Sequence, residues 1–214
     1  MTMNIKKSVF LLLMIFTASC VVAKKKEVFV IKEGDPFILL QEKKTAIFEI
    51  DYSNMMVTDS KDHDNDLLFK EWMIRQDEDN DKWIEDWERE DKIECDKAFR
   101  EHFNDEIKHG IKLTKLGKDY KVILRMTSID FGPAVKMKLM GFGGGEAKAD
   151  GELEVRDLNT DEILLIISFT QLKGESSFKQ IGRLKGIFEN LGEELNDYLE
   201  DIQKEQKKQD KKKK

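Results

Sequence analysis

Residues 120–131, YKVILRMTSIDF, decide the fold expected for this chain. Apolar side chains occupy both alternating sets of positions, which is typical of a strand near the centre of a covered sheet. Gly132 and Pro133 follow directly and favour a turn. The stretch therefore predicts a long strand at the centre of a sheet, and we expect the neighbouring strands in the segments on either side.

The segments after this strand predict further strands. Residues 135–139 alternate apolar residues with lysines, and the glycine-rich residues 141–145 interrupt them. In residues 147–155 small or apolar residues alternate with charged ones, and residues 162–171, EILLIISFTQ, are strongly apolar. A turn centred on Asn159 separates the last two. This order predicts an antiparallel hairpin.

Residues 176–202 carry the helical signal. Apolar residues recur every three or four positions, at Phe178, Ile181, Leu184, Phe188, Leu191, Leu195 and Leu199. Three glycines in this stretch each lower intrinsic helix stability by about 1 kcal/mol, so packing must offset them. Residues 203–214 contain seven lysines and two acidic residues. We expect this basic tail to be disordered. Its last four residues, Lys211–Lys214, serve either solubility or contact with an anionic surface.

The N-terminal half predicts two strands and an acidic helical segment. Residues 27–32 and 45–51 have strand character. Residues 59–106 contain 19 acidic and 8 basic side chains, and helices are expected at 67–75 and 82–109, with a break near 89–91. The expected fold class is α/β (α+β): one domain over residues 27–202, with a mostly antiparallel sheet and helices packed on one face.

Composition limits the class of partner. The 214 residues include 37 Lys and Arg against 43 Asp and Glu, a formal net charge of −6. Nucleic-acid binders need a positive surface for the phosphates, so the acidic balance argues against that class. Hydrophobic residues make up 40% of the chain, which is enough for one core.

The first 23 residues are typical of a secretory signal peptide. Lys6 and Lys7 precede an apolar run over residues 8–18, which is too short to span a bilayer. Two cleavage sites compete. Residues 17–20, TASC, are similar to a bacterial lipoprotein box and would leave Cys20 as the lipidated N-terminus, whereas residues 21–23, VVA, favour an ordinary cut before Lys24. The other cysteine, Cys95, is expected to be buried and inert, and a Cys20–Cys95 disulfide would require Cys20 to be retained without lipid.

A calcium loop is the sharpest candidate site. In residues 77–88, DEDNDKWIEDWE, Asp77, Asp79 and Asp81 occupy positions 1, 3 and 5 of an EF-hand pattern, and Glu88 occupies position 12. Lys82 stands at position 6, where glycine normally provides a left-handed backbone conformation. The alternative is a solvated acidic helix face. We expect no cofactor unless this loop binds calcium.

Two further sets of residues, one of histidines with a glutamate and one of tryptophans, could either bind a ligand or pack in the core. His102, Glu106 and His109 would share one face of a helix and form a zinc site, or else lie at the boundary of the core. The tryptophans at 72, 83 and 87 would form a stacking surface for a ligand, or else pack in the core. No G-x-S-x-G motif is present, and the residues nominate no catalytic set, so we expect a protein that is not an enzyme.

Three stretches together resemble an uncharacterised bacterial envelope family, domain of unknown function 4410. They are residues 95–110 (CDKAFREHFNDEIKHG), 120–131, and above all 140–163 (MGFGGGEAKADGELEVRDLNTDEI), where a glycine-rich turn precedes G-x-L-x-V-x-D and N-T-D. The resemblance implies an exported α/β domain, similar in fold to curli-secretion and Tol-type envelope lipoproteins, and supplies no catalytic residues.

These observations lead to one functional expectation. The chain is interpreted as an exported cell-envelope lipoprotein with an interaction or assembly role. It is anchored through Cys20 to the outer membrane or otherwise periplasmic, and its partners are the membrane and other envelope proteins. The alternative is a calcium-dependent ligand-binding module.

Overall fold

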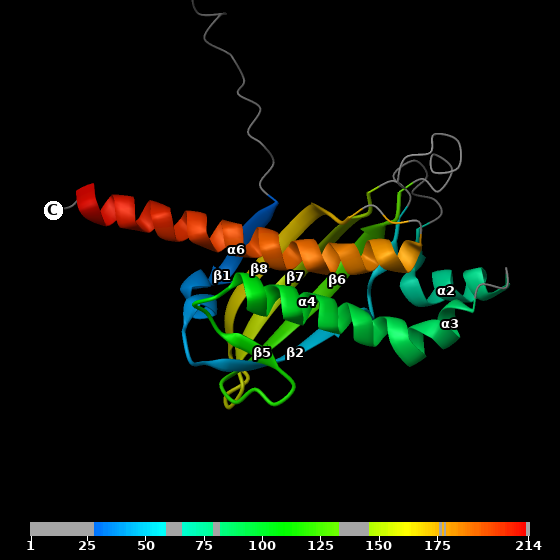
Figure 1. Ribbon diagram of the computed structural model, residues 1–214, viewed down its shortest axis with the longest axis horizontal. Coiled ribbons are helices and arrows are strands. Elements are labelled where there is room, and N and C mark those ends of the chain that lie inside the picture. Colours follow the sequence, from blue (N-terminus) through cyan, green and yellow to red (C-terminus); the bar gives the residue numbers. More distant parts are fainter. Residues whose placement is uncertain are drawn as a thin grey trace, which may run out of the picture.

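The computed structural model describes residues 28–58, 66–78, 82–132, 146–175, 177 and 179–212. Among these residues the fold is α+β, with one eight-stranded sheet and helices on one face (Figure 1). The predicted signal peptide with Cys20, the strand at 135–139 and the glycine-rich residues 141–145 lie outside the described residues. The expected fold class is confirmed.

The strands follow the order β1-β8-β7-β6-β2-β5, with β3 and β4 beside the far end of β6. Pairing is antiparallel except where β2 meets β5 and β6, and where β3 meets β6. The strands are β1 (Phe29–Gly34), β2 (Thr45–Asp51), β3 (Met56–Val57), β4 (Leu67–Leu68), β5 (Lys112–Thr114), β6 (Tyr120–Asp130), β7 (Lys148–Asp157) and β8 (Ile163–Lys173).

The helical elements lie between or after these strands. They are the 3-10 turn η1 (Pro36–Leu40), α2 (Phe69–Glu78), α3 (Trp83–Asp86), the π-helical η3 (Trp87–Asp91), α4 (Lys92–Glu106) and α6 (Gln180–Lys212). Near the expected break at 89–91 the helix is not interrupted but contains the π-helical turn η3, which joins α3 to α4.

Strand β6 occupies the central position that its apolar pattern predicts, between β2 and β7. The alternation in β7 is also explained, because Ala149, Leu153 and Val155 are buried while the residues between them face away from the helices. The hairpin of β7 and β8 is antiparallel, as expected.

Helices α4 and α6 lie side by side on one face of the sheet (Figure 1). Phe48 of β2 stacks on Phe99 of α4 at 4.8 Å between ring centroids, which fixes α4 against the sheet. At Gly192 of α6, an added Cβ would lie 2.9 Å from the backbone nitrogen of Phe103. A glycine is therefore needed where the two helices approach most closely, and this packing offsets its low helix propensity.

Two parts of the chain differ from the sequence expectation. Leu67 and Leu68 form strand β4, because Met56 and Val57 of β3 pair with them, and the helix begins only at Phe69. Helix α6 does not end near residue 202, and residues 203–212 of the expected disordered tail are helical. Pairs four residues apart, such as Lys204 with Glu200 at 3.1 Å, support these exposed turns.

Candidate interaction surface

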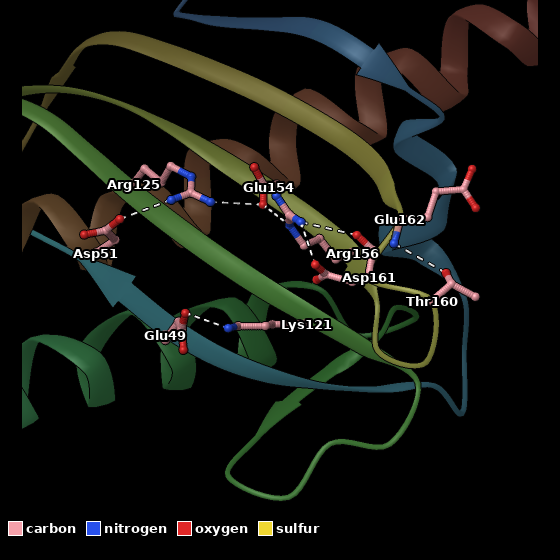
Figure 2. Close-up of polar contacts among 9 residues, drawn as sticks. All are labelled: Glu49, Asp51, Lys121, Arg125, Glu154, Arg156, Thr160, Asp161 and Glu162. Atoms are coloured by element: carbon pink, nitrogen blue, oxygen red, sulfur yellow. Dashed lines mark hydrogen bonds and ion pairs between the residues drawn. The ribbon is translucent and has the colours of Figure 1, made fainter. Parts of the chain in front are cut away.

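The sheet face without helices carries a chain of ion pairs (Figure 2). Arg125 of β6 donates from Nη1 to Asp51 Oδ2 at 3.1 Å and from Nη2 to Glu154 Oε1 at 3.2 Å. Arg156 also donates to Glu154 and reaches Asp161 Oδ2 at 3.2 Å. Five charged side chains from β2, β6, β7 and the following turn thus form one connected network.

Strand register brings these side chains together. Asp51 of β2 lies directly opposite Arg125, which lies opposite Glu152 of β7. Glu154 is two residues further along β7 and shares its face, because side chains alternate along a strand. Arg125 therefore reaches across one strand in register and across the other diagonally.

Glu154 is the buried centre of the network. Its register partners are Ile123 of β6 and Ile166 of β8, and these apolar neighbours leave the residue only 6% exposed. Burial alone would raise its pKa, but hydrogen bonds from Arg156 and Arg125 outweigh burial and hold the pKa of Glu154 below the ordinary value. Glu154 is therefore a fixed negative charge.

Asp51 ends the network at β2. Its Oδ1 accepts hydrogen bonds from Ser53, at 2.9 Å from the backbone nitrogen and 2.6 Å from the hydroxyl. These bonds, followed by the charge of Arg125, keep the pKa of Asp51 below its ordinary value. The carboxylate is held in place from both sides.

A second ion pair and an ordered turn border the network in Figure 2. Lys121 Nζ lies 2.8 Å from Glu49 Oε1, on the same sheet face. In the turn after β7, Asp161 has a left-handed backbone with φ of 58°, and Glu162 donates its backbone N–H to Thr160 Oγ1 at 3.4 Å. The predicted turn at 157–161 is confirmed, and it places Asp161 within reach of Arg156.

The opposite margin of the same face carries several apolar side chains. Phe29 of β1 packs toward α6, so the next residue, Val30, points to the uncovered face, where it is 42% exposed. Leu164 and Ile166 of β8 are partly exposed on this face as well. The face thus combines fixed charges over β2, β6 and β7 with a mixed margin over β8 and β1, where the strand register places Ser168 and Glu33 beside these apolar residues. We call it the uncovered sheet face below.

The calcium prediction is tested only in part. Asp79 and Asp81 lie outside the described residues. Asp77 Oδ1 accepts the backbone N–H of Ile84 at 3.2 Å, and Glu88 is an exposed residue of η3. Lys82 adopts the left-handed conformation, with φ of 51° and ψ of 32°, that position 6 requires. Calcium binding stays a prediction.

The zinc set is not assembled as one helix face. Helix α4 ends at Glu106, and Ile107 leaves the helical conformation with ψ of 74°, so His109 falls in the following turn. His109 Nδ1 instead lies 3.1 Å from Glu42 Oε1. Within the part of the chain that the structure describes, no group of three His, Cys, Asp or Glu side chains is placed to hold a metal ion.

The aromatic residues expected in the acidic segment pack together at one end of the sheet. Trp87 is 3% exposed and meets Tyr52 edge-on at 4.9 Å, whereas Trp72 and Trp83 are partly exposed. Trp72 stacks on Phe131 at 5.1 Å. Packing is therefore the role of Trp87, and Trp72 covers the end of β6.

Sequence analysis missed the ion-pair network. The alternation in β7 indicated that its charged residues face away from the core, but partners on other strands depend on register. Arg125 is the one charged residue in the centre of a largely apolar strand. This pattern could have indicated that Arg125 forms an ion pair, but not with which residues.

Neither a family model nor a curated protein matches this chain. Among solved structures, the PelC dodecamer from Paraburkholderia phytofirmans is similar, with a TM-score of 0.39, 7% identity, and coverage of 78% of this chain and 97% of that chain. A variant of the same dodecamer in another crystal form gives a TM-score of 0.38, 8% identity and the same coverage. Similarity this low carries no information about function. The resemblance to domain family 4410 stays a prediction.

Proposed function

We propose that this chain is an exported cell-envelope protein, anchored by lipid on Cys20, that binds another envelope protein through its uncovered sheet face. The signal-like residues 1–23 and the TASC sequence support the export and the anchor. No helix in the described ranges is long and apolar enough to cross a membrane.

The observation that carries the binding role is the ion-pair network beside the partly apolar margin of β8 and β1. The network holds alternating negative and positive groups at Asp51, Arg125, Glu154 and Arg156 on rigid strands. A fixed charge pattern discriminates between partners, and adjoining apolar area supplies the favourable free energy of association. Helices α4 and α6 cover the other face, and no helix of the described residues lies over this one.

The same geometry favours binding over acid–base catalysis. A general acid or base works best with a pKa near the working pH. The pKa values of Asp51 and Glu154 are instead lowered by their hydrogen-bond donors, and both stay charged near neutral pH. These side chains are suited to permanent charges in an interface.

The anchor is tested by the mass of the mature N-terminus and by fractionation. The proposed form begins at Cys20 with a lipid mass attached, and Cys20→Ala is expected to release the protein from the membrane fraction. A mature chain that begins at Lys24, or an unchanged fractionation of Cys20→Ala, would contradict the lipid anchor.

The binding face is tested by a charge exchange that keeps the local ion pair. The double variant Glu49→Lys with Lys121→Glu reverses the charge pattern while preserving the attraction across 2.8 Å. The matched control, Glu85→Arg with Arg89→Glu, exchanges an exposed pair on the helical side. After crosslinking in cells, we expect the first variant, and not the control, to lose the partner captured by the wild type. Equal capture by all three proteins would refute the assignment of this face.

A further inference from the structure

Helix α6 extends beyond the domain that it covers. Leu199 is its last buried residue, and every residue from Lys204 to Lys212 is exposed. At a rise of 1.5 Å per residue, the turns after Leu199 project by about 20 Å. Figure 1 shows this red end of α6 reaching past the sheet. We call residues 203–212 the helical overhang.

Lysines dominate the overhang and gather on one side of it. Lys204, Lys207, Lys208 and Lys211 recur at intervals of three and four residues, which places them on one helix face. By the same periodicity this face points away from the stripe of Leu195 and Leu199 that packs on the domain. The overhang therefore presents a basic stripe to its surroundings.

The charge of α6 changes sign where the helix leaves the domain. Over the domain, its outward positions carry Glu189, Glu193, Asp197 and Glu200. Lys185 also lies on this part, but its charge is offset by Glu94 at 3.8 Å and Glu189 at 4.0 Å. A negatively charged partner would be repelled along that part and attracted only by the overhang. The charge pattern thus restricts an anionic partner to the projecting end.

The proposed lipid anchor enters the fold beside this end. The ring of Phe29, the first residue of β1, stacks on Tyr198 of α6 at 5.3 Å between centroids. Cys20 precedes Phe29 by nine residues. Fully extended, that segment spans at most about 30 Å. A bilayer that holds the lipid on Cys20 therefore lies within reach of the overhang.

We propose that the helical overhang binds the anionic phospholipid headgroups of the membrane in which Cys20 is anchored. The inference rests on the proposed function for the position of the anchor, and the lysine stripe supplies the second attachment. A cluster of basic side chains is attracted to an anionic bilayer, and this attraction weakens as salt screens it. The contact would also orient the domain, because α6 is rigidly packed on the sheet.

The test separates the overhang from the lipid. Residues 24–214, which lack Cys20 and retain every described residue, are sedimented with phosphatidylcholine vesicles with and without phosphatidylglycerol. The test variant changes Lys204, Lys207, Lys208 and Lys211 to glutamine. The control variant makes the same change at four exposed lysines elsewhere, Lys70, Lys92, Lys97 and Lys108.

We expect binding only to the vesicles with phosphatidylglycerol, a steep loss with added salt, at least a tenfold loss in the test variant, and little loss in the control. The inference would be overturned if the wild type binds neutral and anionic vesicles equally, if the test and control variants lose the same share of vesicle binding, or if the wild type does not bind vesicles. The inference would also be overturned if the wild type self-associates at low salt without lipid while the test variant stays monomeric. That result would mean that the overhang binds an acidic protein surface. If Cys20 proves not to be lipidated but the wild type still binds the anionic vesicles, the lipid anchor is rejected and the binding of the overhang to phospholipid is retained.

Discussion

Phe29 of β1 stacks on Tyr198 of α6, with ring planes 28° apart and centroids 5.3 Å apart. Strand β1 is an edge strand that pairs only with β8 among the described strands. The stack therefore connects the start of the described fold directly to the helix layer. It also fixes where the N-terminal segment leaves the domain relative to the helical overhang.

Removing the Tyr198 ring is expected to loosen β1. Tyr198→Ala deletes a partly buried aromatic side chain, and we expect the free energy of unfolding to fall by about 2 kcal/mol. Hydrogen exchange of the β1 amides should accelerate more than that of β7. Tyr198→Phe keeps the ring and serves as the control, with a smaller loss. Unchanged exchange in β1 would show that the stack does not hold this strand.

The strands that the sequence predicts well are those with a strong local pattern. β6 and β7 lie within two residues of their expected bounds, because β6 is apolar on both faces and burial of one face gives β7 a two-residue alternation. β3, β4 and β5 escaped prediction, since each has two or three residues and exists only because a distant strand pairs with it. The local sequence pattern of such short strands does not predict which distant strand they pair with.

The same limit applies to the candidate surface. Arg125 and Glu154 are 29 positions apart, and their contact depends on the register between β6 and β7, which includes an irregularity between Met126 and Ser128. A shift of one residue would place Glu154 on the opposite face. The sequence could therefore indicate which residues face away from the core, but not which of them pair.

The network is expected to make stability sensitive to acid. Glu154 has a pKa below its ordinary value of 4.5. Its contribution to stability is therefore complete above that value and is lost as the pH falls through the lower pKa of the folded protein. Glu154→Gln removes a largely buried carboxylate with two arginine partners, and we expect a loss of about 2 kcal/mol near neutral pH.

Denaturant titrations at several pH values check this expectation. The difference between wild type and Glu154→Gln should shrink as the pH falls below 4.5, because the unfolded state then takes up a proton that Glu154 of the folded protein resists until its lower pKa is reached. Glu49→Gln, which breaks a more exposed pair with Lys121, is the control and should cost about 0.5 kcal/mol. A difference that does not depend on pH would mean that the charge of Glu154 is not what stabilises the network.

Close packing of the helices makes Gly192 a sensitive position. In Gly192→Ala the added methyl group would meet the backbone of α4 at His102 and Phe103, at 2.9 to 3.1 Å, so the helices must separate. We expect a loss of about 2 kcal/mol, although alanine is the better helix former. Glu193→Ala changes the next, exposed residue and should have little effect. A stabilised Gly192→Ala protein would contradict the close packing.

Cys95 is expected to be unreactive in the folded protein. It is fully buried, and burial, with a further contribution from the charge of Asp91, raises the pKa of the thiol to about 12. Since the thiolate is the nucleophile, iodoacetamide at mildly alkaline pH should leave Cys95 unmodified until denaturant is added. Mass spectrometry before and after unfolding measures this directly. Rapid modification of the native protein would show that the α4 packing opens readily.

Backbone strain at Lys82 provides a separate test. A left-handed conformation costs a residue other than glycine about 1 kcal/mol, and Lys82 has φ of 51°. Lys82→Gly is therefore expected to raise the free energy of unfolding relative to Lys82→Ala, which keeps the Cβ atom. Thermal unfolding of both variants shows which of the two is more stable. A more stable alanine variant would mean that the lysine is not strained.

The same position sharpens the calcium prediction. Lys82 has the backbone conformation of position 6 but adds a positive charge beside Asp77, so Lys82→Gly should bind calcium more tightly than the wild type if the loop is a calcium site. Trp83 lies within the loop and reports binding by fluorescence. Glu88→Gln should abolish the response, whereas Glu90→Gln, an exposed residue after the loop, should not. A flat titration for both the wild type and Lys82→Gly at millimolar calcium would reduce residues 77–88 to a solvated acidic segment.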